Sequence, residues 1–279
     1  MTINKWLSNS FDDYELIDAG GGQKLERWGE IYTIRPDVNA YFSPGLPKEQ
    51  WNSFKPLVFK EFENTKGKWS STHTNWHIAY RSLVFNLETT KFKHVGLFPE
   101  QEVNWKFITQ HLNPSHRFLN LFAYTGAASM VARATGAEVI HVDSVKQLIS
   151  WARKNMESSQ LDGIKWVHED ALKFAQREVK RGNKYDGIIM DPPAWGIGAK
   201  GEKWKIEDQL EPLIQIAYSL LDNDGFLILN TYSPRISLDE INRIAKKYFN
   251  RVETGELWSK AKSGKELFYG HLMRATKDK

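Results

Sequence analysis

Apolar positions follow two different spacings along the second half of the chain. Short apolar runs, such as residues 185–190, are typical of buried strands. Between these runs, apolar residues recur every three or four positions, as Leu148, Ile149, Ala152 and Met156 do. That spacing predicts helices with one buried face. Because the two kinds of segment alternate, the sequence predicts a largely parallel sheet covered by helices.

This pattern assigns elements from residue 117 to near the end of the chain. The predicted strands are 117–122, 138–142, 164–167, 185–190 and 226–231. The predicted helices are 127–134, 145–158, 171–180, 207–221 and 238–248, with a turn at 222–225. Residues 251–257 and 267–273 are expected to form an antiparallel pair around a Ser263-Gly264 turn.

The first 92 residues show a different pattern, in which helical spacing is scarce. Strand-like segments occur at 14–17, 24–28, 31–35 and 83–87. Gly20-Gly21-Gly22 and Gly29 occupy turn positions between them. The sequence therefore predicts a small β-rich N-terminal domain, residues 1–92, packed against a second domain, residues 93–279.

Composition narrows the class of protein. The chain has 279 residues, of which 41% are hydrophobic and 26% charged, as in ordinary soluble globular proteins. It contains no cysteine, which excludes disulfides, zinc–thiolate sites and cysteine nucleophiles. No apolar run reaches the roughly 20 residues of a membrane span, and no signal peptide is visible, so a cytoplasmic location is expected. The net charge of +4 mildly favours nucleic acid as a partner.

Acidic or glycine residues follow four consecutive predicted strands. Gly126 lies in the loop after the first strand, and Asp143, Asp170 and Asp191 follow the next three. The carboxyl ends of parallel strands meet at one edge of the sheet, where open α/β sheets bind ligands. Each residue alone has a plain interpretation, as a helix cap or a turn. Together they predict an adenosine-type cofactor, with backbone N–H groups at Gly126, ribose at Asp143 and adenine at Asp170.

S-adenosylmethionine suits this series better than other adenosine cofactors. A dinucleotide site requires G-x-G-x-x-G, whereas this loop has one glycine, and no G-x-x-x-x-G-K-[ST] motif for ATP occurs. The Asp191-Pro192-Pro193-Ala194-Trp195 segment ends the fourth strand abruptly, because two prolines cannot continue it. A carboxylate, carbonyls and an aromatic ring there suit a planar substrate group with an N–H edge.

These residues resemble class I S-adenosylmethionine-dependent methyltransferases. More narrowly, they are similar to the branch related to bacterial large-subunit (23S) rRNA methyltransferases of the cytosine-C5/guanine-N7 type. The narrower resemblance rests on the segments Gly96-Leu97-Phe98-Pro99-Glu100-Gln101, Asn120-Leu121-Phe122-Ala123-Tyr124-Thr125-Gly126 and Asp191-Pro192-Pro193-Ala194-Trp195. The resemblance covers the chain from about Lys91 onward and implies an α/β fold with a Rossmann-like seven-stranded sheet, mostly parallel with an antiparallel C-terminal pair. The small N-terminal domain resembles that of the same branch, without its RNA-binding PUA domain.

The resemblance also implies the roles of individual residues. It implies S-adenosyl-L-methionine as cofactor, S-adenosyl-L-homocysteine as product, and no metal. The expected cofactor-binding residues are Phe98, Gln101, Asn120, Phe122, Ala123, Tyr124, Thr125, Gly126, Ala127, Asp143, Ser144, Val145, Asp170, Ala171, Asp191 and Pro193. The expected catalytic residues are Asp191, Pro192 and Trp195, and the expected substrate-binding residues are Trp195, Lys200, Lys203 and Tyr232.

The absence of cysteine limits which atom of the substrate can be methylated. Cytosine C5 becomes nucleophilic only after a thiolate adds to C6, and related C5 enzymes carry a cysteine where this chain has Asn230-Thr231-Tyr232-Ser233-Pro234. The expected target is therefore a base nitrogen in RNA, with rRNA as the expected partner. Methylation of a protein amide or a small metabolite is an open alternative. So is a catalytically inactive RNA-binding relative, with an NAD oxidoreductase as a more distant one.

Overall fold

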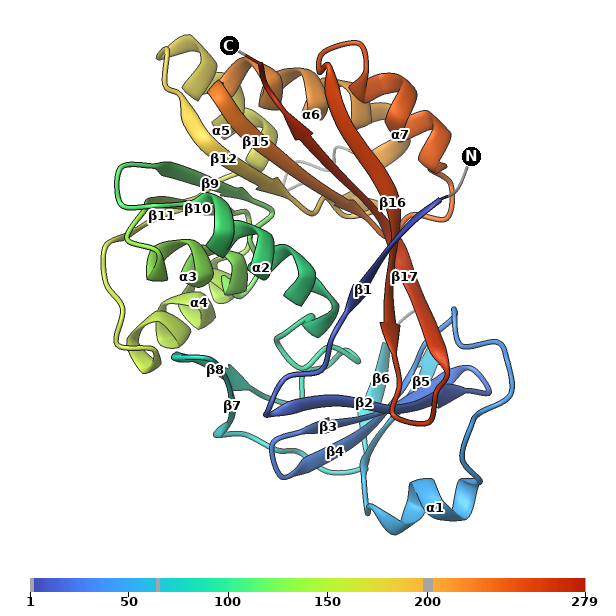
Figure 1. The fold of residues 1–279 in the computed structure, drawn as a ribbon. Coiled ribbons are helices and arrows are strands. Elements are labelled where there is room, and N and C mark those ends of the chain that lie inside the picture. The colour runs from blue at the N-terminus through green and yellow to red at the C-terminus, as the bar shows by residue number, and fades with distance from the viewer. Residues whose placement is uncertain (1–2, 64–65, 198–202, 279) are drawn as a thin grey trace.

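A computed structural model describes residues 3–63, 66–197 and 203–278. Its main feature is an eight-stranded sheet in the order β1-β16-β17-β15-β12-β9-β10-β11 (Figure 1). Strand β17 is antiparallel to β15 and β16, whereas the other pairs are parallel. The strands are β1 Asn4–Ser8, β9 Arg117–Leu121, β10 Glu138–Asp143, β11 Ile164–His168, β12 Tyr185–Met190, β15 Leu221–Thr231, β16 Arg251–Lys260 and β17 Glu266–Thr276.

Helices cover both faces of this sheet. One face carries α2 (Glu102–His111), α3 (Ala127–Ala134) and α4 (Lys146–Ser158). The other carries α5 (Ala171–Lys180), α6 (Ile206–Leu220) and α7 (Leu238–Ala245). Successive side chains of a strand point to opposite faces, so the apolar runs of the central strands supply two cores.

Strand β9 shows this division. Phe118 packs in the same cluster as Met130 of α3, whereas Leu119 and Leu121 pack in the cluster that contains Phe174 of α5. Burial on both faces explains why the strand has no clean alternation of apolar and polar residues. The Rossmann-like α/β fold predicted from the sequence is confirmed.

A smaller β-rich part lies beside the large sheet. It contains a five-stranded sheet, β2 to β6 in chain order, and a hairpin of β7 and β8. The elements are β2 Tyr14–Gly20, β3 Gln23–Trp28, β4 Ile31–Pro36, α1 Lys48–Ser53, β5 Leu57–Glu63, β6 Lys66–Trp69, β7 Trp76–Tyr80 and β8 Leu83–Leu87. The predicted boundary at residue 92 stays a prediction.

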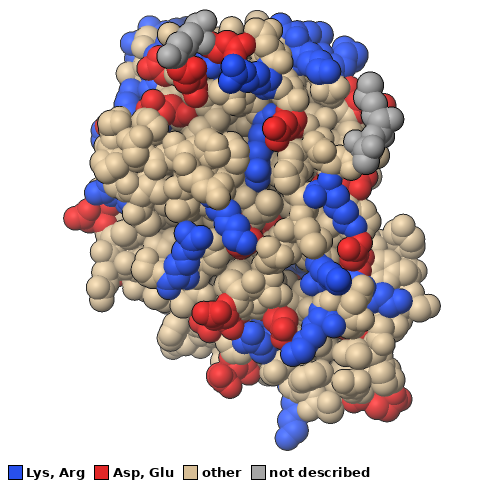
Figure 2. Space-filling view, viewed as in Figure 1, with Lys and Arg blue, Asp and Glu red and all other residues tan. Residues whose placement is uncertain are grey.

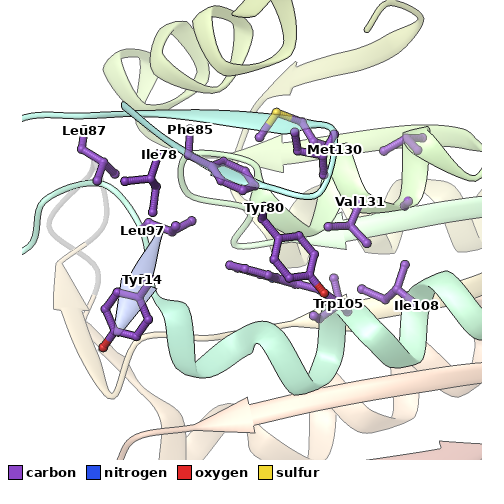
Figure 3. Close-up of a cluster of buried hydrophobic side chains, with 14 of the residues drawn as sticks. Tyr14, Ile78, Tyr80, Phe85, Leu87, Leu97, Trp105, Ile108, Met130 and Val131 are labelled. Atoms are coloured by element: carbon purple, nitrogen blue, oxygen red, sulfur yellow. The ribbon is translucent and has the colours of Figure 1, made fainter. Parts of the chain in front are cut away.

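The β7–β8 hairpin packs into the helical layer. Figure 3 shows Tyr80 and Phe85 from this hairpin directed toward Trp105 of α2, with Met130 and Val131 of α3 nearby. The rings of Tyr80 and Trp105 lie edge to face, with their centroids 5.0 Å apart. One buried apolar cluster therefore extends from the β-rich part into the large sheet.

The large sheet differs from the prediction in two features. Strand β1 joins the large sheet in parallel with β16, which adds an eighth strand to the seven that were predicted. The turn predicted at residues 222–225 lies within β15 instead. The register shifts between Tyr185 and Gly187 of the neighbouring strand, and Asp224 has a φ of 61°, so the strand continues through a local irregularity.

Candidate cofactor and substrate site

Two adjacent cavities lie at the carboxyl edge of the large sheet, where the strand order reverses between β9 and β12. Their volumes are about 660 Å³ and about 60 Å³. Most of the residues predicted from the sequence line them. The larger cavity is lined by Phe98, Phe122, Tyr124, Asp143, Ser144, Val145, Asp170, Ala171, Asp191, Pro192, Pro193 and Tyr232. The smaller is lined by Phe98, Gln101, Asn120, Phe122, Ala123, Tyr124, Thr125, Gly126, Ala127 and Asp191.

The loop between β9 and α3 has an unusual backbone. Phe122, Tyr124 and Gly126 have φ values of 59°, 52° and 87°, in the left-handed region that non-glycine residues seldom adopt. A Cβ atom at Gly126 would lie 3.0 Å from the Cβ of Ala152 in α4, so this position also requires the absence of a side chain. Such strain clusters at ligand sites, where a loop must present its backbone in one fixed form.

Buried polar side chains support this loop from below. The Asn120 amide donates to the Ser129 hydroxyl over 2.9 Å, and the Ser129 Oγ lies 3.0 Å from His141 Nδ1. Burial lowers the pKa of His141 to about 3, so the ring is neutral near pH 7. The chain of contacts ties β9, α3 and β10 together beneath the loop.

Asp143 ends β10 and joins two loops. Its carboxylate accepts hydrogen bonds from the backbone N–H groups of Tyr124 and Val145, each over 2.9 Å. Burial raises the pKa of the Asp143 carboxyl, while these N–H groups act in the opposite direction. A carboxylate has about four acceptor positions, so two remain for a ligand in the larger cavity.

Asp170 has the local role that its sequence context also suggested. It is the N-cap residue of α5, and its side chain accepts a hydrogen bond from the backbone N–H of Lys173 over 2.9 Å. It lines the larger cavity at the same time, beside Ala171. The cap and the cavity therefore use the same side chain.

Asp191 lies where the two cavities meet, directly after β12. Its half-buried carboxyl is 3.4 Å from the Gln101 side-chain nitrogen. Burial, and next the negative charge of Glu100, raise the pKa of the Asp191 carboxyl to about 8. Pro192 follows it and is buried, which fixes the direction of the chain leaving the strand.

A hydrogen-bonded network connects Asp191 to strands β15 and β17. Gln101 donates to the Tyr232 hydroxyl over 2.8 Å, and Asn104 donates to both Gln101 and Asn230, over 2.8 Å and 2.9 Å. Arg274 of β17 donates in turn to Asn104 over 3.2 Å. The polar wall of the site is therefore held by several elements of the fold.

Two of the predicted substrate or catalytic residues line neither cavity. Trp195 is 58% exposed in β13 (Trp195–Ile197) and lines neither cavity. Lys203 is exposed in β14 (Lys203–Lys205), which pairs with β13. Lys200 lies outside the described residues. The short hairpin turns Trp195 outward, whereas Trp204 donates a hydrogen bond of 2.7 Å to the Pro193 carbonyl and packs 5.5 Å from the Phe122 ring.

The far wall of the larger cavity was not predicted. It consists of residues from the β-rich part, the segment before α2, helix α4 and β17, namely Lys24, Arg35, Pro36, Asp37, Val38, Asn39, Lys93, His94, Glu100, Leu148 and Tyr269. No motif in the sequence marks these residues as neighbours, because they meet only when β3, β4 and β17 pack together. The alternation of residues along β3 and β4 indicates which side chains share one face of the sheet. It does not indicate that this face borders the cavity.

Within residues 3–63, 66–197 and 203–278, no group of three or more His, Cys, Asp or Glu side chains is arranged to hold a metal ion. None of the helices in this described part has the length and apolarity needed to cross a membrane.

Comparison with known proteins shows the family. Residues 57–251 match the family model for S-adenosylmethionine-dependent methyltransferases. The crystal structure of the SAM-dependent methyltransferase from Agrobacterium tumefaciens is 33% identical, with a TM-score of 0.91 over 98% of this chain and 93% of that chain.

Two curated relatives have names that refer to ribosomal RNA. Ribosomal RNA large subunit methyltransferase K/L from Magnetococcus marinus is 30% identical over 80% of this chain, but over 30% of its own length. Ribosomal RNA large subunit methyltransferase K from Neisseria meningitidis serogroup B is 30% identical over 56% of this chain and 45% of its own length. The chain thus spans less than half of either relative.

The family model covers more than half of the chain, and its cavity-lining residues follow β9, β10, β11 and β12 in order. The chain belongs to the S-adenosylmethionine-dependent methyltransferase family.

Proposed function

We propose that this protein methylates a nitrogen atom of a base in ribosomal RNA. Asp191 carries the proposal, because it lines both cavities, and Pro192, which follows it, lines the larger one. The Asp191 carboxyl and the Pro192 carbonyl both accept hydrogen bonds, which suits a planar substrate with an N–H edge. The relatives named as ribosomal RNA methyltransferases support RNA as the substrate.

The cavity residues fit S-adenosylmethionine. The smaller cavity, lined by the strained loop and Gln101, has no Lys or Arg among its lining residues, which suits an amino-acid zwitterion better than a pyrophosphate. In our assignment the two remaining acceptor positions of Asp143 bind the ribose hydroxyls. Ser144, Val145, Asp170 and Ala171 line the next part of the larger cavity and surround the adenine.

The cofactor supplies an electrophilic methyl group. The side chains of the protein then act mainly by position, because an in-line displacement needs the nucleophile held in line with the bond that breaks. Asp191 and the Pro192 carbonyl accept the substrate N–H, while Gln101 and Tyr232 fix the wall behind them. The chain has no cysteine, so no thiolate adduct forms on the base.

An RNA base in a duplex must leave its stack to enter a cavity in the protein. The exposed ring of Trp195 lies just after the Asp-Pro-Pro segment, where it is available to stack on a neighbouring base. Lys203 lies across the same hairpin and suits a phosphate contact. Figure 2 shows basic and acidic side chains interspersed over one face of the molecule, so we assign RNA contacts to local groups rather than to one basic field.

The test is transfer of a tritiated methyl group to separated cell fractions: ribosomes, protein-free rRNA, other RNA, protein and small metabolites. We expect label in rRNA or ribosomes, and none with the Asp191→Ala variant. Label confined to protein or metabolites would replace RNA with an amide or a small molecule as substrate. Binding of S-adenosylhomocysteine without label in any fraction would indicate an inactive relative.

A further inference from the structure

The larger cavity continues beyond the residues assigned to the cofactor. Its far wall carries polar groups from three separate parts of the chain: Lys24 of β3, Glu100 of the short 3-10 helix η1 (Pro99–Gln101), and Tyr269 of β17. None of these groups has a task in the cofactor assignment. They line the same cavity as Asp191.

Glu100 is the unusual member of this wall. The residue is only 4% exposed and lines the cavity, yet among the described residues its carboxyl has no hydrogen-bond partner except its own backbone N–H. Burial raises the pKa of the Glu100 carboxyl, while the positive charges of Lys24 and Arg35 favour its ionised form. A buried carboxylate is costly without a hydrogen-bond donor, so a ligand that supplies one would be stabilised here.

Two hydrogen-bond donors line the same cavity as Glu100. The Tyr269 hydroxyl is buried and has no partner among the described residues. The Lys24 ammonium lies 3.3 Å from Asp37 and 3.8 Å from Glu26, and 4.9 Å from the centre of the Tyr269 ring. An ammonium has three N–H groups, so two carboxylates leave one available.

Arg35 acts differently, as part of the framework. It donates two hydrogen bonds of 2.7 Å to Glu26 and one of 3.0 Å to the Lys93 carbonyl. These contacts hold β3 and β4 in fixed positions and keep the positive charge near Glu100. Lys24 therefore lies on a strand that these contacts hold in place.

We infer that Glu100, Lys24 and Tyr269 bind the N–H and C=O edge of a lactam ring, as in guanine or uracil, and so select the base that is methylated. This inference rests on the proposed function. The carboxylate accepts the ring N–H, and Lys24 or Tyr269 donates to the neighbouring carbonyl oxygen. Adenine and cytosine present a ring nitrogen acceptor beside an amino group, which would place a lone pair against the Glu100 carboxylate. A site built from buried hydrogen-bonding groups rejects such a mismatch strongly.

Kinetics of variants provide the first test. Glu100→Gln and Lys24→Met should each lower kcat/KM for rRNA roughly 10- to 100-fold, the loss typical of one charged hydrogen bond. S-adenosylhomocysteine affinity should stay unchanged, which also shows that the variants fold. Glu30→Gln and Lys246→Met, at exposed positions, are the matched controls. Equal kcat/KM for Glu100→Gln and the wild type would overturn the inference.

The identity of the methylated nucleoside gives the second test. Digestion of labelled rRNA should yield methylated guanosine or uridine, whereas methylated adenosine or cytidine would overturn the inference and leave the proposed function standing. A third test does not depend on turnover. With S-adenosylhomocysteine present, GMP or UMP should bind more tightly than AMP and CMP, and Glu100→Gln should remove the difference.

The three tests distinguish a failure of the proposed function from a failure of the lactam site. If no RNA fraction accepts methyl groups, the proposed function fails, while Glu100-dependent preference for GMP or UMP would still support a lactam site. Equal binding of all four nucleotides, or binding of none, would overturn the lactam site whatever the rRNA result.

Discussion

Gln101 donates a hydrogen bond of 2.8 Å to the Tyr232 hydroxyl, and the same nitrogen lies 3.4 Å from a carboxyl oxygen of Asp191. One amide thus joins the segment before α2 to the ends of β12 and β15. The contact fixes the acceptor groups at the junction of the two cavities from a direction that no single strand provides. The geometry of Asp191 therefore depends on Tyr232, which lies 131 residues after Gln101 in the sequence.

Tyr232→Phe tests this contact. The variant removes the acceptor for Gln101, so we expect a loss of about 1 kcal/mol in the free energy of unfolding. We also expect kcat to fall while S-adenosylhomocysteine affinity is retained. Urea denaturation, steady-state kinetics and calorimetry measure the three quantities. Equal weakening of cofactor binding and turnover would place Tyr232 in the cofactor site instead.

Asp143→Ala should weaken binding of S-adenosylhomocysteine by about 10- to 100-fold, because it removes a charged acceptor of the ribose hydroxyls. It also leaves the N–H groups of Tyr124 and Val145 without their acceptor, so the melting temperature should fall. Asp143→Asn restores one acceptor oxygen and should recover part of the stability and little of the affinity. Titration calorimetry compares the three proteins, and an unchanged dissociation constant for Asp143→Ala would refute the ribose assignment.

Asp191 should give the reaction a pH dependence. Its carboxyl has a raised pKa of about 8, so in the free enzyme it is mostly protonated at pH 7 and ionises as the pH rises. The ionised form is the stronger acceptor, and kcat/KM should therefore increase with pH until about 8. Asp191→Asn keeps an acceptor oxygen but cannot ionise, so its kcat/KM should be lower and lack this rise. Asp191→Ala should bind the cofactor normally and transfer no methyl group.

The same raised pKa has a consequence for stability. The carboxyl titrates at about 8 in the folded protein, against an ordinary value of 3.8. Its contribution to stability is present below pH 3.8 and is lost as the pH rises toward 8. The free energy of unfolding of the wild type, measured relative to Asp191→Asn, should therefore decrease across this interval. A flat difference would show that folding does not raise the pKa of this carboxyl.

Gly126→Ala should disrupt the loop between β9 and α3. Its φ of 87° disfavours any side chain, and the new Cβ would lie 3.0 Å from that of Ala152. We expect a loss of roughly 1–2 kcal/mol in stability and weaker S-adenosylhomocysteine binding. In the double variant with Ala152→Gly the contact disappears while the backbone strain remains. Thermal melts of both single variants and the double variant should show a favourable interaction between the two substitutions, and strict additivity would show that the contact is harmless.

His141 should make the protein sensitive to acid. Burial lowers its folded-state pKa to about 3, against an ordinary value of 6.5. The unfolded chain therefore binds a proton that the folded protein does not, and stability is lost as the pH falls from 6.5 toward 3, by up to ~1.4 kcal/mol per pH unit. His141→Asn should reduce this slope in urea denaturation at pH 7, 6 and 5. Some slope should remain, because burial also lowers the pKa of His94 to about 3. An unchanged slope would show that His141 is charged or exposed.

The sequence predicted the cofactor edge because that edge is encoded locally. Asp143 and Asp191 each follow an apolar strand directly, and parallel strands bring their ends together whatever the rest of the chain does. Gly126 could be assigned in the same way. Helix α2 was not predicted, because buried Glu102 and Asn104 interrupt its apolar spacing. These polar residues are paired within the folded protein, which the pattern alone does not reveal.

The features that the sequence did not predict depend on tertiary packing. Glu100 and Lys24 are 76 residues apart and meet only because the β-rich part packs against the large sheet. Trp195 stays a predicted substrate residue, but its exposure on the surface follows from the pairing of β13 with β14. Neither the common position of Glu100 and Lys24 nor the exposure of Trp195 depends on the local spacing of residues. The sequence pattern could therefore predict neither.

Strand β1 has a consequence for the order of events during synthesis. Trp6 pairs with Leu257, about 250 residues later, so β1 cannot pair until β16 has been synthesised. Contacts of such long sequence separation form slowly. Ser8, at the end of β1, donates a hydrogen bond of 3.1 Å to the Pro99 carbonyl, next to Glu100. The far wall of the cavity, which includes Tyr269 of β17, can therefore reach its final form only after the ribosome has made both β16 and β17.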